Sequence, residues 1–159
     1  MKDGFLNWAK ENGWTVDESA EVQTLPAAAA ERYSNLPASW YEFAEHLKNC
    51  ADAGDTVWFL TMDSYFPKDE NEWQYNEFER ISLEAAGDDD ETWTEQIQNF
   101  WNGHFPIVMS VRNGYEYYAI RISDGSVVFG AEPEFEETEV AAESFEDFLQ
   151  KVTSGEILL

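Results

Sequence analysis

Basic residues are scarce in this chain of 159 residues: nine lysines and arginines stand against 33 aspartates and glutamates, for a formal net charge of −24. Binding to nucleic acid depends on lysine and arginine that displace counterions from phosphates, so this shortage argues against a nucleic-acid partner. Anionic lipid headgroups are repelled for the same reason. The charge would steer a basic protein toward the chain, while solubility or adaptation to salt are the alternative explanations.

Cysteine and histidine are also rare. Cys50 is the single cysteine, which excludes an intrachain disulfide, and we interpret it as a small apolar residue near a helix end. Together with His46 and His104 it supplies too few ligands for a zinc site. The acidic run at 87–95 (GDDDETWTE) has Trp93 where a calcium-binding EF-hand loop requires glycine. We therefore predict no metal and no cofactor.

Long apolar runs are missing as well. No stretch approaches the roughly 18 apolar residues that span a membrane, and the N-terminus (MKDGFLNWAKENG) has no apolar segment of signal-peptide length. We therefore expect no membrane contact and a cytoplasmic location. Hydrophobic residues still make up 43% of the chain and aromatic residues 16%, which is ample for a core. We expect residues 1–159 to form a single domain.

Apolar residues recur at helical spacing in several segments. They predict a helix over 5–12 that ends at Gly13, a helix after Pro26, a helix over 39–47 closed by residues 49–55, a helix from Thr92 to Gly103, and a last helix from Ser144. Capping-box spacing, with an acidic residue three positions later, occurs at Ser39, Thr92 and Ser144. The segment 73–81 (WQYNEFERI) fits either a strand or a short helix.

Strand signals follow the helical ones. TVWFLT at 56–61 is rich in β-branched and aromatic residues and predicts a strand. Within 105–130, Asn113-Gly114 and Asp124-Gly125 are typical of two-residue hairpin turns. This region therefore predicts a three-stranded antiparallel meander.

Two-residue loops would also fix the register of the meander. The predicted core face carries Ile107, Met109, Val111, Tyr118, Ile120, Ile122, Val127 and Phe129. The opposite face mixes polar and aromatic residues, which suits a wet or partner-facing surface. Because tyrosine is enriched at binding hot spots, Tyr115 and Tyr117 on that face are candidate partner-binding residues, with ordinary strand composition as the alternative.

Three segments, in order, resemble the SUKH superfamily. LPASWYEFAEHL (36–47) is similar to its early helix, in which Leu-Pro is followed by two residues, an aromatic, any residue and Phe. The stretch 105–137 resembles its central meander, and AAESFEDFLQKV (141–152) resembles its closing helix. Residues 62–91 show little of this resemblance.

The resemblance implies an α+β fold, with an antiparallel β-sheet flanked by α-helices. Bacterial members are typically immunity proteins that bind and neutralise toxins, often nucleases or deaminases. A eukaryotic branch is similar to a yeast regulator of cell-wall synthesis that acts through protein partners. We therefore expect an immunity protein that binds a basic protein toxin, with a regulatory or scaffold module as the alternative, and leave the oligomeric state open.

Catalysis is the third hypothesis. The sequence has no glycine-rich phosphate loop and no GxSxG nucleophile elbow. Carboxylates are numerous enough to supply a hydrolase with an acid–base pair, but no feature singles one pair out. We therefore predict that the chain is not an enzyme and has no catalytic residues.

Two acidic clusters are further candidates for partner binding. One follows the last meander strand and consists of Glu132, Glu134, Glu136, Glu137 and Glu139; the other is the loop of Asp88, Asp89 and Asp90. Nucleases hold phosphates in basic clefts, and an acidic surface can occupy such a cleft because it carries the same charge as the substrate. A solvated loop is the alternative interpretation for each cluster.

Overall fold

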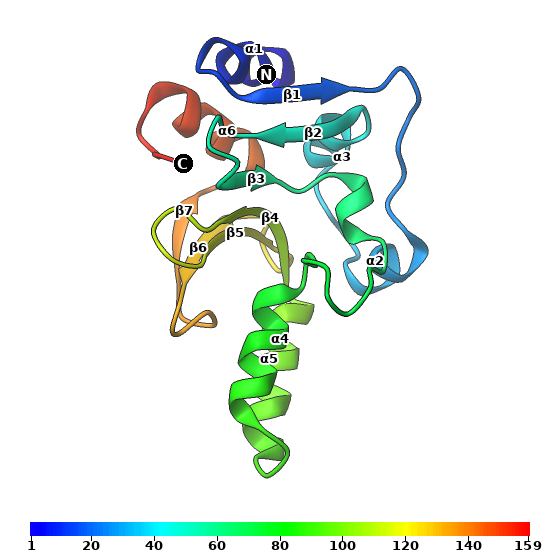
Figure 1. Cartoon of the computed structure of the whole chain (residues 1–159), viewed down its shortest axis with the longest axis vertical. Helices are drawn as coiled ribbons and strands as arrows, with labels where there is room; N and C mark the ends of the chain where they lie inside the picture. The colour runs from blue at the N-terminus through cyan, green and yellow to red at the C-terminus, as the bar shows by residue number, and fades with distance from the viewer.

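A computed structural model describes residues 1–159. Its strands form one seven-stranded antiparallel sheet in which each strand pairs with the next along the chain (Figure 1). The strands are β1 (Thr15–Glu18), β2 (Leu47–Ala51), β3 (Val57–Phe59), β4 (His104–Ser110), β5 (Glu116–Arg121), β6 (Val127–Ala131) and β7 (Thr138–Ala142). The helices are α1 (Lys2–Glu11), α2 (Ala27–Arg32), α3 (Ala38–Ala44), α4 (Glu77–Ala86), α5 (Glu91–Asn102), α6 (Phe145–Ser154) and the short 3-10 helix η1 (Met62–Tyr65). The predicted α+β class is confirmed.

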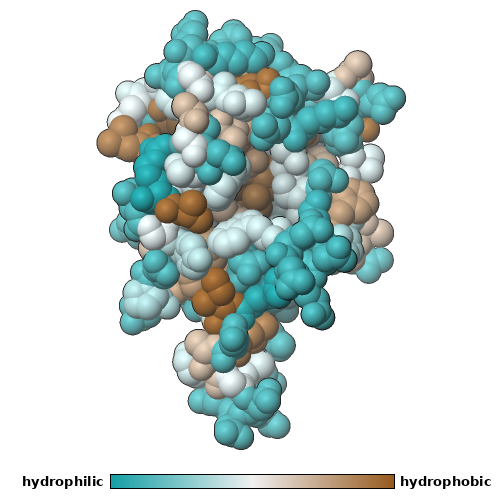
Figure 2. Space-filling view, in the orientation of Figure 1, coloured by the Kyte–Doolittle hydropathy of each residue, from teal (hydrophilic) through white to brown (hydrophobic).

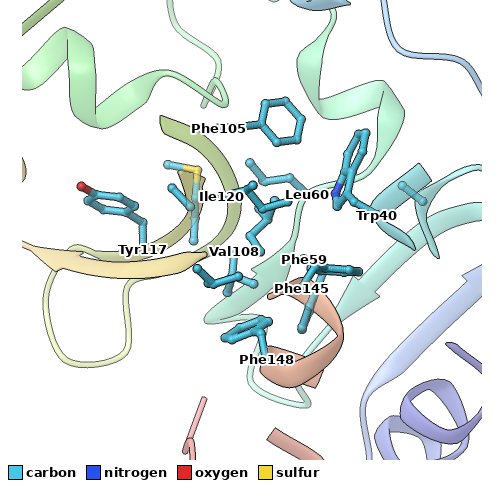
Figure 3. Packing of buried hydrophobic residues seen from close by; sticks show 14 of the residues in the cluster. Trp40, Phe59, Leu60, Phe105, Val108, Tyr117, Ile120, Phe145 and Phe148 are labelled. Atoms are coloured by element: carbon cyan, nitrogen blue, oxygen red, sulfur yellow. The ribbon is translucent and has the colours of Figure 1, made fainter. Parts of the chain in front are cut away.

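Helices α1, α3 and α6 contribute to the main core on one face of the sheet. The ring of Phe59 on β3 lies 4.8 Å from that of Phe5 on α1 and 5.5 Å from that of Phe43 on α3. Phe148 of α6 lies 4.9 Å from Tyr118 of β5. Figure 3 shows this packing around Phe59 and Phe148. Such aromatic pairs add about 0.5–1.5 kcal/mol each beyond the area that they bury.

The antiparallel pair α4–α5 packs on the opposite face and projects away from the sheet (Figure 1). Trp101 of α5 and Phe78 of α4 lie 4.9 and 5.8 Å from the ring of Tyr117 on β5. Successive strand residues point to opposite faces, so Tyr117 and Tyr118 serve the two cores. The outer end of the α4–α5 hairpin has no strand to pack against. Every helix is too short or too polar to cross a bilayer.

Strand β2 replaces a predicted helix end. Helix α3 stops at Ala44, and Leu47–Ala51 forms a strand that pairs with β1 and β3. The predicted closing loop over 49–55 is therefore wrong in its first half. Leu47 is buried as the first residue of β2. A continued helix would bury it as well, because it lies four residues after Phe43. Periodicity alone could not separate the two.

The helix starts only partly match the predicted caps. Ser144 caps α6, and its Oγ accepts a hydrogen bond from the Asp147 N–H at 3.1 Å. Helix α3 instead begins after Pro37, and the Oγ of Ser39 is buried without a partner. Helix α5 begins after Asp90, whose side chain is the cap in place of Thr92. The ambiguous segment that starts at residue 73 ends in helix α4.

The β5–β6 hairpin has a longer loop than predicted. The Arg121 N–H donates to the Ser126 carbonyl at 2.8 Å, which leaves a four-residue loop between them. Ile120 consequently pairs with Val127, where the two-residue loop predicted Phe129. A shift of two residues preserves the faces, so the predicted grouping of Ile120 with Val127 on one face is correct.

The β4–β5 hairpin differs from the predicted register by one residue over 108–110, which exchanges the faces of that part of β4. A bulge between Pro106 and Val108 makes the difference two residues over 104–106, where the faces stay as predicted. Val108, rather than Met109, lies opposite Tyr118. Both faces of this region are buried, and Tyr117 is 0% exposed beneath the α4–α5 pair. The prediction of Tyr117 as a partner-facing residue is therefore wrong, because the sheet has a second core where a wet face was expected.

Candidate partner-binding surface

The loop between β6 and β7 is attached to the second core by one aromatic side chain. Phe135 is buried and stacks on Phe78 of α4, with ring centroids 4.6 Å apart and planes 8° apart. The hydroxyl of Tyr117 donates a hydrogen bond to the Phe135 carbonyl. Burial raises the pKa of Tyr117, so this hydroxyl stays protonated as the donor. Phe135 therefore fixes the loop in place, and the glutamates of the loop stand on either side of this buried residue.

Gly130 of β6 makes room for this arrangement. A Cβ at this position would lie 2.5 Å from a carbon of the Tyr117 ring and 2.6 Å from its hydroxyl oxygen. Real Cβ atoms do not approach other heavy atoms this closely, so the ring crosses the strand only because residue 130 has no side chain. Gly130 thus determines where Tyr117, and through it the loop, can lie.

The carboxylates of the loop fall into two groups. Glu132 accepts a hydrogen bond from the Tyr115 N–H at 3.2 Å, and Glu136 accepts one from the Trp101 indole N–H at 2.9 Å. Glu134 and Glu137 are exposed and form neither an ion pair nor a side-chain hydrogen bond. These two are the members of the loop whose charge is most open to a partner.

The tip of the α4–α5 hairpin carries the second predicted cluster. Gly87 ends α4 with a φ of 67°, a backbone conformation that favours glycine. Asp90 caps α5 by accepting a hydrogen bond from the Trp93 N–H at 2.9 Å. Asp88 and Asp89 are exposed and form no ion pair. The tip therefore presents two uncompensated charges at the far end of the projection.

Trp93 stands three residues after Asp90 on α5 and beside the β6–β7 loop. It is 44% exposed and lines a groove of about 250 Å³ with Pro133 and residues 134–137 of the loop. The structure thus brings the β6–β7 loop against the hairpin, with Asp88 and Asp89 a few residues before Trp93. We call the set of Asp88, Asp89, Trp93, Glu134 and Glu137 the acidic surface.

Sequence reasoning missed the role of Trp93. Its spacing to Ile97 and Trp101 predicted a buried helical stripe, and only Ile97 and Trp101 are fully buried. Trp93 occupies the first turn of α5, away from the sheet, and remains 44% exposed beside the β6–β7 loop. Its place directly after the acidic run was the available signal.

Tyr115, the remaining predicted residue, lies outside the acidic surface. Its side chain is half-buried, and its ring centroid lies 5.6 Å from both Phe78 and Trp73. Tyr115 therefore supports the second core more than it faces solvent. Of the nine predicted residues, the structure gathers Glu134, Glu136 and Glu137 beside Trp93, places the Glu132 carboxylate at the Tyr115 N–H, and places the three aspartates at the hairpin tip.

A buried ion pair ties the hairpin to α2. An amino group of Arg32 lies 2.5 Å from the Glu79 carboxylate, and Arg32 also donates to Tyr75 and Asn102. Burial raises the pKa of Glu79, an effect that the Arg32 hydrogen bond opposes. Because Arg32 contacts residues of both helices of the hairpin, it holds α2 against them, and we assign this ion pair a structural role.

The residues considered as metal ligands or nucleophiles lie apart from one another. Burial raises the pKa of the Cys50 thiol to about 12. His104 stacks on Phe100 at 3.9 Å, and burial lowers its pKa. His46 lies with its Nδ1 3.0 Å from the Ser19 carbonyl. No group of three or more histidine, cysteine, aspartate or glutamate side chains is arranged to hold a metal.

The fold and the acidic surface together define an α+β meander protein that presents charged loops on a rigid sheet. Comparison with family models then gives the particular family. The chain belongs to the SMI1/KNR4 family (SUKH-1), whose model matches residues 19–151. This confirms the resemblance and spans residues 62–91, where the sequence showed little of it. No curated protein and no solved structure matches the chain significantly.

Proposed function

We propose that this chain is an immunity protein that binds and neutralises a basic protein toxin in the cytoplasm, and that it does so through the acidic surface rather than by catalysis. Membership of the SUKH family supports this role, because its bacterial members typically act in this way. The observation that carries the choice of surface is that exposed carboxylates without ion pairs flank an exposed tryptophan.

Electrostatics gives the reason for a basic partner. The net charge of −24 attracts a cationic protein over distances near the Debye length, about 8 Å at physiological salt. Glu134 and Glu137 on the β6–β7 loop, and Asp88 and Asp89 at the tip of the α4–α5 hairpin, add uncompensated charge on two neighbouring segments. A toxin that holds phosphates in a basic cleft would find a similar charge there.

Short-range contact would come from Trp93. Tryptophan is enriched among the few residues that contribute most of the energy of an interface. The indole stands beside a loop that Phe135 fixes in the core, so little conformational freedom is lost when a partner binds. A fixed aromatic anchor surrounded by charge combines affinity with a fast, salt-dependent association.

The first test is protection. The chain is co-expressed with the toxin encoded by the neighbouring gene, and growth is compared with that of cells that express the toxin alone. We expect the wild-type chain to restore growth and to form a complex that weakens as salt rises. Absence of protection contradicts the toxin proposal, and recovery of a set of housekeeping proteins from host lysate would favour the regulatory or scaffold alternative.

The second test places the surface. Glu134→Lys with Glu137→Lys is compared with Glu11→Lys with Glu31→Lys, which changes the net charge equally at exposed residues elsewhere. We expect the first pair to weaken toxin binding about 100-fold, because like charges juxtaposed in an interface cost several kcal/mol, and the second pair to weaken it less than about threefold. Equal effects of the two pairs would show that binding does not use the acidic surface.

A further inference from the structure

A cleft lies between strands β2–β3 and residues 61–75, and it shares no residue with the acidic surface. Strands β2 and β3 pair at one position, Ala51 with Trp58, so no ladder closes the space between their other ends. The volume of the cleft is about 480 Å³, within the range of roughly 300–1,000 Å³ found for small-molecule sites. Figure 1 places these elements around the middle of the molecule, where Figure 2 shows a hollow with pale and brown side chains.

Two tryptophans form apolar walls of this cleft, and both are held in place. The indole N–H of Trp58 donates to the Asp55 carboxylate at 2.6 Å. Trp73 packs edge-on against Phe78 and Tyr115, with ring centroids 5.8 and 5.6 Å away, yet it remains 42% exposed. Fixed indole faces that stay accessible favour a flat aromatic ligand, since little freedom remains to be lost.

The charge of the cleft is opposite to that of the molecule. Lys48, Lys68 and Asp63 are its charged lining residues, so two ammonium groups stand against one carboxylate. Lys68 contacts Asp63 at 3.1 Å, whereas Lys48 has no carboxylate within 4.0 Å. Of the nine lysines and arginines in the chain, only Lys2 and Lys48 lack such a partner. In a protein so rich in carboxylates, an exposed ammonium group that lines this cleft without an ion pair points to an anion from outside.

We propose that this cleft binds a small aromatic carboxylate, with its ring against Trp58 and Trp73 and its carboxylate on Lys48. The amides of Asn49 and Gln74 line the same space and supply polar groups that can orient the ligand. This site is separate from the acidic surface and stands whether or not the chain neutralises a toxin.

The test is a nuclear magnetic resonance titration of the full chain with 2-naphthoate, compared with the neutral 2-naphthalenemethanol. We expect saturable shifts at the indole N–H groups of Trp58 and Trp73 and at least about tenfold weaker binding of the neutral compound. Lys48→Met keeps most of the side-chain length and should weaken naphthoate binding about five- to tenfold, the effect of one nearby opposite charge at a partly exposed site. Lys2→Met removes the other free lysine and should change nothing.

A second variant acts in the opposite direction. Asp63→Asn releases Lys68 from its ion pair and removes the one carboxylate that lines the cleft. Naphthoate should then bind about threefold more tightly or better. Shifts that map outside the cleft, equal affinity for the neutral compound, or equal effects of Lys48→Met and Lys2→Met would each overturn the proposal.

Discussion

The replacement Gly130→Ala tests whether the second core fixes the β6–β7 loop. The new methyl group would lie 2.5 Å from the Tyr117 ring, well inside the contact distance of two carbon atoms. Tyr117 cannot move aside, because Trp101 and Phe78 pack against it and its hydroxyl is bonded to the Phe135 carbonyl. Either the ring or strand β6 must shift, and both carry the loop with them.

The expected cost follows from the packing. Overfilling a close-packed core costs about 1–3 kcal/mol, and we expect the upper part of this range because the ring is enclosed on several sides. Tyr117→Leu alone should cost about 2–4 kcal/mol, through lost ring contacts and an unpaired carbonyl at Phe135. In the Tyr117→Leu background the clash is gone, so Gly130→Ala should then cost less than about 1 kcal/mol.

Urea unfolding of the four proteins in this double-mutant cycle measures these values. We expect a coupling free energy of at least about 1 kcal/mol between Gly130 and Tyr117, within the range seen for residues in contact. Gly4→Ala is the matched control, because no atom lies within 4 Å of the added methyl and the position is helical. That change should stabilise the protein by about 0.5–1 kcal/mol.

Additive effects in the cycle would refute the reasoning, since they would mean that the methyl group and the ring do not compete for space. A Gly130→Ala protein as stable as the wild type would refute it as well. The four proteins also bear on the proposed function. Gly130→Ala should weaken toxin binding although residue 130 lies outside the acidic surface, because the loop that carries Glu134 and Glu137 is displaced.

Two further predictions concern stability. Asp52 is buried, and hydrogen bonds from Thr56, Val57 and Arg112 outweigh this burial and hold its pKa below the ordinary value. Its ionised form therefore contributes stability above about pH 4 that is lost as the pH falls. Asp52→Asn should lower the free energy of unfolding at pH 7 by about 1–3 kcal/mol. The variant should also lose less stability than the wild type between pH 7 and pH 2, as measured by urea unfolding at each pH. Ser144→Ala removes the N-terminal cap of α6 and should lower the free energy of unfolding, measured by calorimetry, by about 1 kcal/mol. Ser154→Ala, at the other end of the helix, should have little effect.

The fold class was predictable because the strongest signals in the sequence are local. The apolar stripe from Phe145 to Val152 with Ser144 before it, and the short β-branched run that contains β3, each favour one structure on their own. Their order along the chain then matches one family. Strand β1 (Thr15–Glu18) was not predicted, because three of its four residues are exposed and only pairing with β2 makes it a strand.

The registers were less predictable because side chains, rather than the turn dipeptides, set the hairpin loops. Asp124 accepts hydrogen bonds from the Ser126 N–H and hydroxyl, at 3.0 and 2.7 Å, which stabilises a four-residue loop over the two-residue alternative. At the other hairpin, the Glu132 carboxylate binds the Tyr115 N–H from a different strand. A contact across 17 residues leaves no mark in local sequence.

The candidate surface was predictable in its charge but not in its shape. Loops rich in glutamate and aspartate are visible in sequence, whereas the second core that orients one of them depends on Tyr117, whose face was predicted correctly but is buried instead of wet. Trp93 was expected inside because its helical spacing to Ile97 and Trp101 does not show that the first turn of α5 lies away from the sheet. The error at Tyr117 follows from assuming that the sheet has one buried face, when helices lie on each side of it.

The few cations of the chain are placed so that an acidic protein can fold although most of its carboxylates, those of the acidic surface among them, have no ion pair. The two most buried carboxylates in ion pairs, Asp52 and Glu79, are each matched by an arginine, as a buried charge requires. The other paired cations meet partly or fully exposed carboxylates near their own positions. None is left for Glu134 and Glu137, whose charges are tolerable because water solvates them. Burial therefore accounts for the two arginine pairs, and the acidic surface is an exposed region whose charge a basic partner could neutralise.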